Sequence, residues 1–262
     1  MRSKYAMAGL IGIMTVGGLA VACGGGSESS TGASNRPLLR ITEFTVKPGQ
    51  QATFESAWKE LLARREQAGS SVAVNVSVND AGVYRVIYNM GTWENFETYF
   101  QETSALPGEF PAEAFEQSVS SISSSIHRAR PDLGYTPANP RFAGNQLTNE
   151  EYDFIKYFFI HNRPGTGRQA EDILRRMAEV RQRHDVDTPM IVTRSVVASD
   201  GPMILIRLHF EDIADSYTHS AEYLAEMGDD FQSLLDEMNV LARHIETSNN
   251  VVRRDLSYQP AN

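Results

Sequence analysis

The end of this chain nearly repeats a segment from its middle. The last ten residues, Arg253–Asn262, match Arg130–Asn139 at seven of ten positions, 123 residues earlier and without a gap. A repeat at fixed spacing indicates that one structural unit occurs twice in the chain. We therefore expect two copies of one fold, joined so that the chain can act as a built-in dimer.

The two copies begin with the same elements, offset by 116 residues. The first copy predicts a strand over 38–46, a Pro-Gly turn and a helix near 50–67. The second predicts a strand over 154–162, another Pro-Gly turn and a helix over 167–183. Apolar residues in both helices recur at i, i+3, i+4, i+7 and i+8, so each helix should bury one face.

Each copy continues with the signals of a β-hairpin. Residues 72–90 contain two strand-forming runs separated by a turn, and residues 190–210 do so again around an Asp-Gly pair. Asp-Gly between two such runs is a strong hairpin signal. A second helix and a last strand complete each copy, and we expect the last strands to pass through Arg130 and Arg253.

The order strand–helix–strand–strand–helix–strand is the ferredoxin-like arrangement, with helices on one face of an antiparallel sheet. The other face of each sheet is bare, and two bare faces can cover each other. The sequence therefore predicts an α+β fold in which two tandem ferredoxin-like (βαββαβ) repeats form an intramolecular pseudo-dimeric α+β barrel. We place repeat 1 at 38–137, a linker at 138–151 and repeat 2 at 152–262.

A family resemblance starts at Arg40–Gly49, which is followed by a helix containing Phe54 and Trp58. This opening resembles NIPSNAP-like and antibiotic-biosynthesis-monooxygenase-like domains, over 38–135 and again over 152–258. The resemblance implies the dimeric α+β barrel fold. That superfamily includes cofactor-free monooxygenases, haem-degrading enzymes, isomerases and proteins without known catalysis, so the fold does not select one function.

The N-terminus resembles a bacterial lipoprotein signal peptide. Arg2 and Lys4 precede an apolar run over 6–22, which ends in Ala-Val-Ala before Cys23, the only cysteine of the chain. The resemblance implies that residues 1–22 are removed and that Cys23 is lipidated, palmitate included. Two alternatives are a retained membrane anchor, which needs about 20 apolar residues, and an ordinary secretory signal, which would leave a stray thiol.

The lipoprotein resemblance also implies a location and a partner. Residues 23–37 would form a flexible Gly/Ser tether, and Gly24 after the cysteine favours the outer membrane, facing the periplasm. Without Arg2 and Lys4, 22 basic residues stand against 33 acidic ones, a net charge of −11. This charge argues against binding nucleic acid. The expected partners are therefore the membrane, through the lipid, and a small hydrophobic or aromatic ligand, and the sequence names no partner protein.

Strand alternation selects the candidate site residues. Ile204, Ile206, Leu208 and Phe210 should face the helices, so the alternate residues should face the opposing sheet. The inward-facing polar and aromatic residues are the ligand-binding candidates: Glu43, Arg85, Asn89, Tyr157, His161, Arg207 and His209. Buried charges are costly unless they are paired, so this set forms either ion pairs or a small-molecule pocket.

The expected function is non-catalytic binding of a small ligand or a partner protein by a lipid-anchored envelope protein. We assign no catalytic residue, no cofactor and no metal, because the histidines lack zinc-site spacing and no phosphate loop is present. The alternative is a cofactor-independent monooxygenase-like enzyme for an aromatic or polyketide-like substrate. In that case His161 and His209 would act as base and acid, since imidazole titrates near neutral pH.

The repeated terminal segment and Trp58 receive structural interpretations. Asp132 and Asp255 recur with Tyr135 and Tyr258 at the two copy ends, which is typical of a structural lock. Trp58 lies on the apolar face of its helix, which favours a core position.

Overall fold

The computed structural model describes residues 36–142, 152–198 and 201–260. The predicted signal peptide, Cys23, most of the tether and part of the linker lie outside these residues. Within the described residues, no helix combines the length and apolar character that crossing a membrane requires.

Each half has the predicted order of elements. The first half contains β1 (Leu38–Val46), α2 (Gln51–Gln67), β2 (Val74–Asn79), β3 (Val83–Gly91), α3 (Glu94–Ser104), α4 (Ala112–Ser118) and β4 (Val119–Ala129). The second half contains β5 (Phe154–Asn162), α5 (Gly167–Arg183), β6 (Ile191–Val197), β7 (Met203–Phe210), α6 (Ile213–Leu241) and β8 (Ala242–Val252). Two prolines, Pro107 and Pro111, lie between α3 and α4, whereas α6 runs on with a kink at Gly228.

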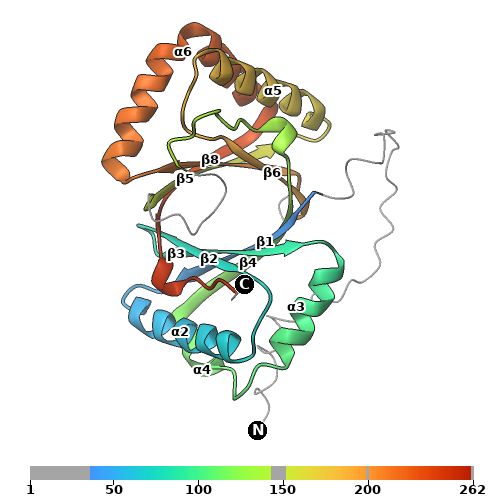
Figure 1. Ribbon diagram of the computed structural model, residues 1–262, viewed down its shortest axis with the longest axis vertical. Coiled ribbons are helices and arrows are strands. Elements are labelled where there is room, and N and C mark those ends of the chain that lie inside the picture. Colours follow the sequence, from blue (N-terminus) through green and yellow to red (C-terminus); the bar gives the residue numbers. More distant parts are fainter. Residues whose placement is uncertain (1–35, 143–151, 199–200, 261–262) are drawn as a thin grey trace.

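The eight strands form one closed barrel in the order β1-β3-β2-β8-β5-β7-β6-β4. Within each half the order is the ferredoxin-like one, and the halves join through β2–β8 and β4–β6, both antiparallel. Helices α2, α3 and α4 cover one side of the barrel and α5 and α6 the other (Figure 1). The predicted α+β fold of two tandem repeats is therefore confirmed.

Strand alternation divides the buried residues into three clusters. Phe44 and Val46 pack with α2 on the helix side of the first sheet, while Ile204 and Ile206 pack under α5 and α6. Inward-facing residues form a third cluster inside the barrel, including Ile41, Ile87, Phe142, Tyr152, Ile155, Tyr157, Phe159 and Leu205. Trp58 is buried in the first cluster, so its predicted core position is confirmed.

The repeated motif crosses between the halves. The first strap, residues 130–135, follows β4 but pairs with Met190 of the second half through Tyr135. The second strap, residues 253–258, follows β8 and pairs with Val74 of the first half through Tyr258. In Figure 1 the second strap, in red, accordingly lies beside α2 and β2 of the first half.

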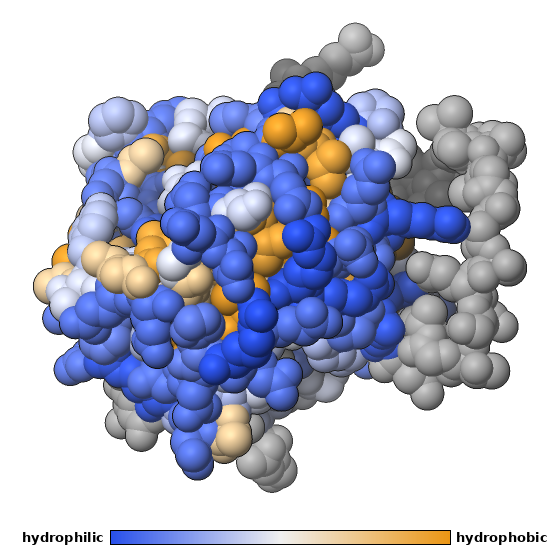
Figure 2. Space-filling model, turned by 90° about the horizontal axis from the view of Figure 1, so that it is seen from above, coloured by the Kyte–Doolittle hydropathy of each residue, from blue (hydrophilic) through white to orange (hydrophobic). Residues whose placement is uncertain are grey.

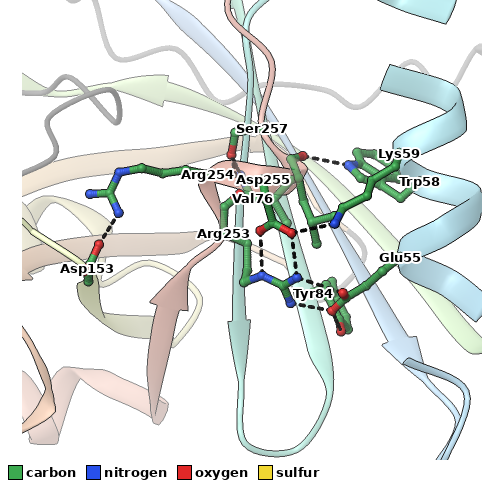
Figure 3. A network of polar contacts seen from close by, with 11 residues as sticks. Glu55, Trp58, Lys59, Val76, Tyr84, Asp153, Arg253, Arg254, Asp255 and Ser257 are labelled. Carbon is green, nitrogen blue, oxygen red and sulfur yellow. Dashed lines mark hydrogen bonds and ion pairs between the residues drawn. The ribbon is translucent and has the colours of Figure 1, made fainter. Parts of the chain in front are cut away.

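An arginine fixes each strap to the opposite helix. Arg253 binds Glu55 of α2 and Asp255 of its own strap, and the Trp58 indole donates to the Leu256 carbonyl at 2.8 Å (Figure 3). The hydrogen bond from Arg253 holds the pKa of Glu55 and of Asp255 below their usual values. This exchange of straps between the halves explains why the segment at the end of the chain repeats one from its middle.

The first strap is built in the same way. Arg130 binds Asp132 of its own strap and makes two bonds of 2.8 and 2.9 Å to Glu171 of α5, which stands 116 residues after Glu55. Our expectation that the last strands pass through Arg130 and Arg253 is wrong, because β4 ends at Ala129 and β8 at Val252. Both arginines leave the sheet to reach the carboxylates of the opposite helix.

Candidate ligand-binding chambers

The middle of the barrel is filled by an arginine network. Arg85 is buried and donates to Glu43 at 2.9 Å and to Asn250 at 3.0 Å. Its guanidinium also lies over the rings of Tyr157 and Phe159, at 4.4 and 4.5 Å from their centroids. The structure therefore brings three predicted site residues together as an ion pair against aromatic rings.

Arg207 and His209 are less well paired than Arg85. Both are buried, and neither Nε of Arg207 nor Nε2 of His209 has a hydrogen-bond partner among the described residues. The His209 ring stacks on Tyr152 at 4.3 Å. Burial, with the Arg207 charge nearby, lowers the pKa of His209 to about 3, so the imidazole is neutral at physiological pH.

His161 is far from His209. On β5 and β7 the pairs His161–Met203 and Ile155–His209 are six residues apart along the strand. At about 3.3 Å per residue, the two histidines are roughly 20 Å apart and cannot serve one substrate atom as acid and base. His161 instead lines a small cavity of about 110 Å³, which Glu43 also lines, and Asn89 is exposed.

A larger cavity lies outside the barrel, between the second sheet and helices α5 and α6. It has a volume of about 370 Å³, within the range of small-molecule sites, whereas the interior cavity is below it. We call it the C-terminal chamber, and it is lined mainly by apolar side chains: Phe158, Ile160, Met177, Met190, Ile206, Leu208, Phe210, Leu224, Met227, Phe231, Leu235, Met238 and Ile245. Its four methionines can adapt to ligands of different shape.

Among the described residues, two basic side chains and no acidic one line the C-terminal chamber. Arg181 of α5 is almost fully buried, and burial lowers its pKa to about 10. Burial also lowers the pKa of Lys156 on β5, whose ammonium lies 5.7 Å from the ring centroids of Phe158 and Tyr217. Figure 2 looks onto this helical side of the molecule, where hydrophobic atoms appear in a furrow between hydrophilic ones.

The first half has a corresponding cavity of about 570 Å³. This N-terminal chamber lies between the first sheet and helices α2, α3 and α4, and its lining is rich in aromatic rings: Phe44, Trp58, Tyr88, Tyr99, Phe100, Phe110 and Phe115. Its buried arginine, Arg65, stands 116 residues before Arg181. Arg65 donates to Ser70 and Thr103 at 3.1 Å each and lies over the ring of Tyr99.

The sequence contains signals for the C-terminal chamber that our prediction missed. Arg181 follows Ile173 and Met177 at four-residue spacing, which puts a charge on the buried stripe of α5. Lys156 alternates with Phe158 and Ile160, which puts a second charge on the helix-facing side of β5. A charge at an apolar position of each element was the available sign that these two elements face a cavity.

Comparisons with known proteins identify the fold. The sequence matches no protein-family model and no curated protein. Similar solved structures include an anthrone oxidase-like protein (10% identity, TM-score 0.61, covering 88% of this chain and 96% of the other). A candidate monooxygenase from Fusobacterium nucleatum subsp. nucleatum has 12% identity and a TM-score of 0.57, with 83% and 92% covered.

A mutant chlorite dismutase from Candidatus Nitrospira defluvii is similar at 7% identity and a TM-score of 0.51, with 84% and 92% covered. At these identities the likeness extends to the fold alone. The structural neighbours therefore agree with the dimeric α+β barrel implied by the sequence resemblance, and the chemistry must be argued from the side chains.

Metal and haem chemistry find little support in the residues present. The described part of the chain contains no group of three His, Cys, Asp or Glu residues placed to hold a metal ion. Haem iron is usually held by His, Cys, Met with His, or Tyr. Among the described residues that line the C-terminal chamber there is no His or Cys, and the hydroxyl of Tyr223 already bonds Asp187 and Thr188. We derive no step through haem.

Proposed function

We propose that the C-terminal chamber binds a small, largely apolar molecule of aromatic type and oxidises it without a cofactor, as a monooxygenase-like enzyme. The observation that carries this proposal is the 370 Å³ cavity with apolar walls and two basic groups. Such a lining gives a ligand binding energy from its walls and orientation from a few polar atoms. The fold shared with candidate monooxygenases is compatible with this chemistry.

Lys156 is the proposed base. Oxidation without a cofactor requires that the substrate become electron-rich by losing a proton, and general bases work best when their pKa is near the working pH. Burial shifts the pKa of Lys156 downward, toward that range. Overall, an activated CH₂ group and O₂ become C=O and H₂O, with the substrate supplying the electrons.

Binding is tested by filling the chamber. Met227 is buried and lines the cavity, so the indole of Met227→Trp would occupy ligand space. Val251→Trp, at an exposed position away from the chamber, is the control. We expect anthrone, as the probe, to raise the melting temperature of the wild type and of the control but not of Met227→Trp. An equal rise in Met227→Trp would remove the chamber as the site.

Catalysis is tested by oxygen uptake with anthrone as the substrate. Lys156→Met should lower the rate by about 100-fold or more, the usual contribution of a general base. Lys47→Met is a matched control, because Lys47 is on the first half and donates to the carbonyls of Glu116 and Gln117, away from the chamber. Binding without any uptake by the wild type would leave a binding protein in place of an enzyme.

We further propose that Cys23 carries the lipid that holds the protein to the envelope. The support is the signal-like sequence of residues 1–22 and the Gly/Ser tether after the cysteine. Cys23→Ser should move the protein from the membrane fraction to the soluble fraction, and mass spectrometry of the wild-type N-terminal peptide should find acyl chains on Cys23. An unprocessed N-terminus would contradict this proposal.

A further inference from the structure

We infer that the ligand of the C-terminal chamber carries a negative charge and that Arg181 pairs with it. This inference rests on the proposed function and names the class of molecule: an aromatic body with a carboxylate, sulfonate or acidic phenol. It follows from the position, the hydrogen bonding and the surroundings of one guanidinium group.

Arg181 is held in a buried place with most of its donors unused. Among the described residues, only Nη2 has a hydrogen-bond partner, the Thr188 carbonyl at 2.5 Å, and the buried Nε has none. The guanidinium also lies 5.7 Å from the Tyr135 ring, on the first strap. Buried polar groups are nearly always paired in native proteins, so an orphaned buried cation on a cavity wall indicates a missing anion.

The carboxylate that acts on Arg181 from nearby is already engaged. Asp187 accepts hydrogen bonds from Tyr223 and from Thr188 and makes no ion pair with Arg181. Burial, together with the hydrogen bond that Tyr223 donates to Asp187, raises the pKa of its phenol to about 12, so Tyr223 adds no negative charge at neutral pH. The anion that would complete the Arg181 site must therefore come from the ligand.

In the first half, the equivalent arginine has hydrogen-bond partners for its donors. Arg65 occupies the repeat-equivalent position, but Ser70, Thr103 and aromatic rings occupy its donors and its face. Burying an arginine at this position therefore does not by itself require open donors. The difference is specific to the chamber that also contains Lys156.

The basic lining of the C-terminal chamber contrasts with the acidic character of the whole chain. The chain has a formal net charge of −9, yet the described residues that line the chamber include two bases and no acid. A cationic, poorly solvated pocket in an acidic protein selects anions, because interactions between charges are stronger away from water.

The test uses two fluorescent probes with the same ring system and the purified protein. 1-Anilinonaphthalene-8-sulfonate is anionic, and N-phenyl-1-naphthylamine lacks the sulfonate. We expect the wild type to bind the sulfonate about 10- to 100-fold more tightly, the range of a hydrogen-bonded charge pair. Arg181→Gln retains a donor for the Thr188 carbonyl but removes the charge. It should erase most of this preference and leave binding of the neutral probe within about threefold.

Two further variants keep the inference testable. Arg65→Gln removes the equivalent charge from the other chamber and should leave the preference unchanged. Lys156→Gln should lower it less than Arg181→Gln, because the Lys156 ammonium is only partly buried. If Arg181→Gln does not fold, the preference of the wild type for the sulfonate and its decrease in Lys156→Gln still test the charge pairing.

The outcomes separate the inference from the function on which it rests. Equal binding of the two probes by the wild type, or an unchanged preference in Arg181→Gln, would overturn the charge pairing while leaving the chamber as the site. If Met227→Trp binds both probes as tightly as the wild type does, the C-terminal chamber is excluded as their binding site.

Discussion

The two halves have the same fold, but different helices cover their chambers and different side chains line them. In the first half the chain breaks between α3 and α4, and the ring of Phe115 packs against Phe44, Phe54 and Trp58. In the second half the long α6 spans the sheet above a lining rich in methionine, and the buried arginine keeps open donors. Duplication thus preserved the scaffold and left one copy with a buried arginine that forms no ion pair among the described residues.

The largest expected effect compares the two strap arginines. Glu171 is 5% exposed and binds both Arg130 and Arg194, while the side chains of Glu55 and Arg253 are 21% and 24% exposed. Arg130→Met should therefore cost about 2 kcal/mol of unfolding free energy, because buried Glu171 loses two charged hydrogen bonds but keeps Arg194 as a partner. Arg253→Met should cost about 1 kcal/mol, because water can solvate Glu55. Urea unfolding measures both, and equal losses would contradict the asymmetry.

An intermediate effect is a loss of stability in mild acid. The unfolded imidazole binds its proton near pH 6.5, whereas folded His209 does so only near 3 and folded His127 near 4, chiefly because of burial. Between these values the unfolded state binds more protons. Stability is therefore complete above pH 6.5 and falls as the pH drops, by up to about 1.4 kcal/mol per pH unit for each histidine.

This pH effect separates the barrel interior from the chambers. His209→Phe should flatten the fall in melting temperature between pH 6.5 and 5, and His244→Phe, at an exposed position, should not. A wild-type melting temperature that stays constant over this window would show that the interior histidines are solvated, and would return the interior to consideration as a site.

The smallest expected effect has opposite signs in the two halves. Arg65→Gln loses its hydrogen bonds to Ser70 and Thr103, so it should lower the free energy of unfolding by about 1 kcal/mol. Arg181→Gln removes a buried cation without an ionic partner and should be neutral or stabilising by about 1 kcal/mol. Thermal unfolding of the two variants without ligand checks this, and a destabilised Arg181→Gln would mean that the Arg181 charge is already compensated.

The sequence was sufficient for the architecture because the fold depends on periodic features. The 116-residue offset and the alternation in 203–210 place both sheets and their inward faces correctly. The exchange of straps was not predictable, because Arg253 and Glu55 are 198 residues apart and either helix of the duplicated pair offers an equivalent glutamate.

The candidate site was harder to predict because alternation gives a side chain's face but not its partners. Glu43 and Arg85 face inward as predicted, yet they bind each other and leave only a small cavity. Their ligand-binding role, like that of Tyr157 and Arg207, stays a prediction that the chamber proposal does not use. The charges of Lys156 and Arg181 lay on faces that the pattern assigned to the core.

A crystal structure with 1-anilinonaphthalene-8-sulfonate bound tests the central claim most directly. The account predicts the naphthalene between α5, α6 and the outer face of β5 and β7, with the sulfonate oxygens against the guanidinium of Arg181. Density for the probe inside the barrel against Arg207, or only in the N-terminal chamber beside Arg65, would contradict it.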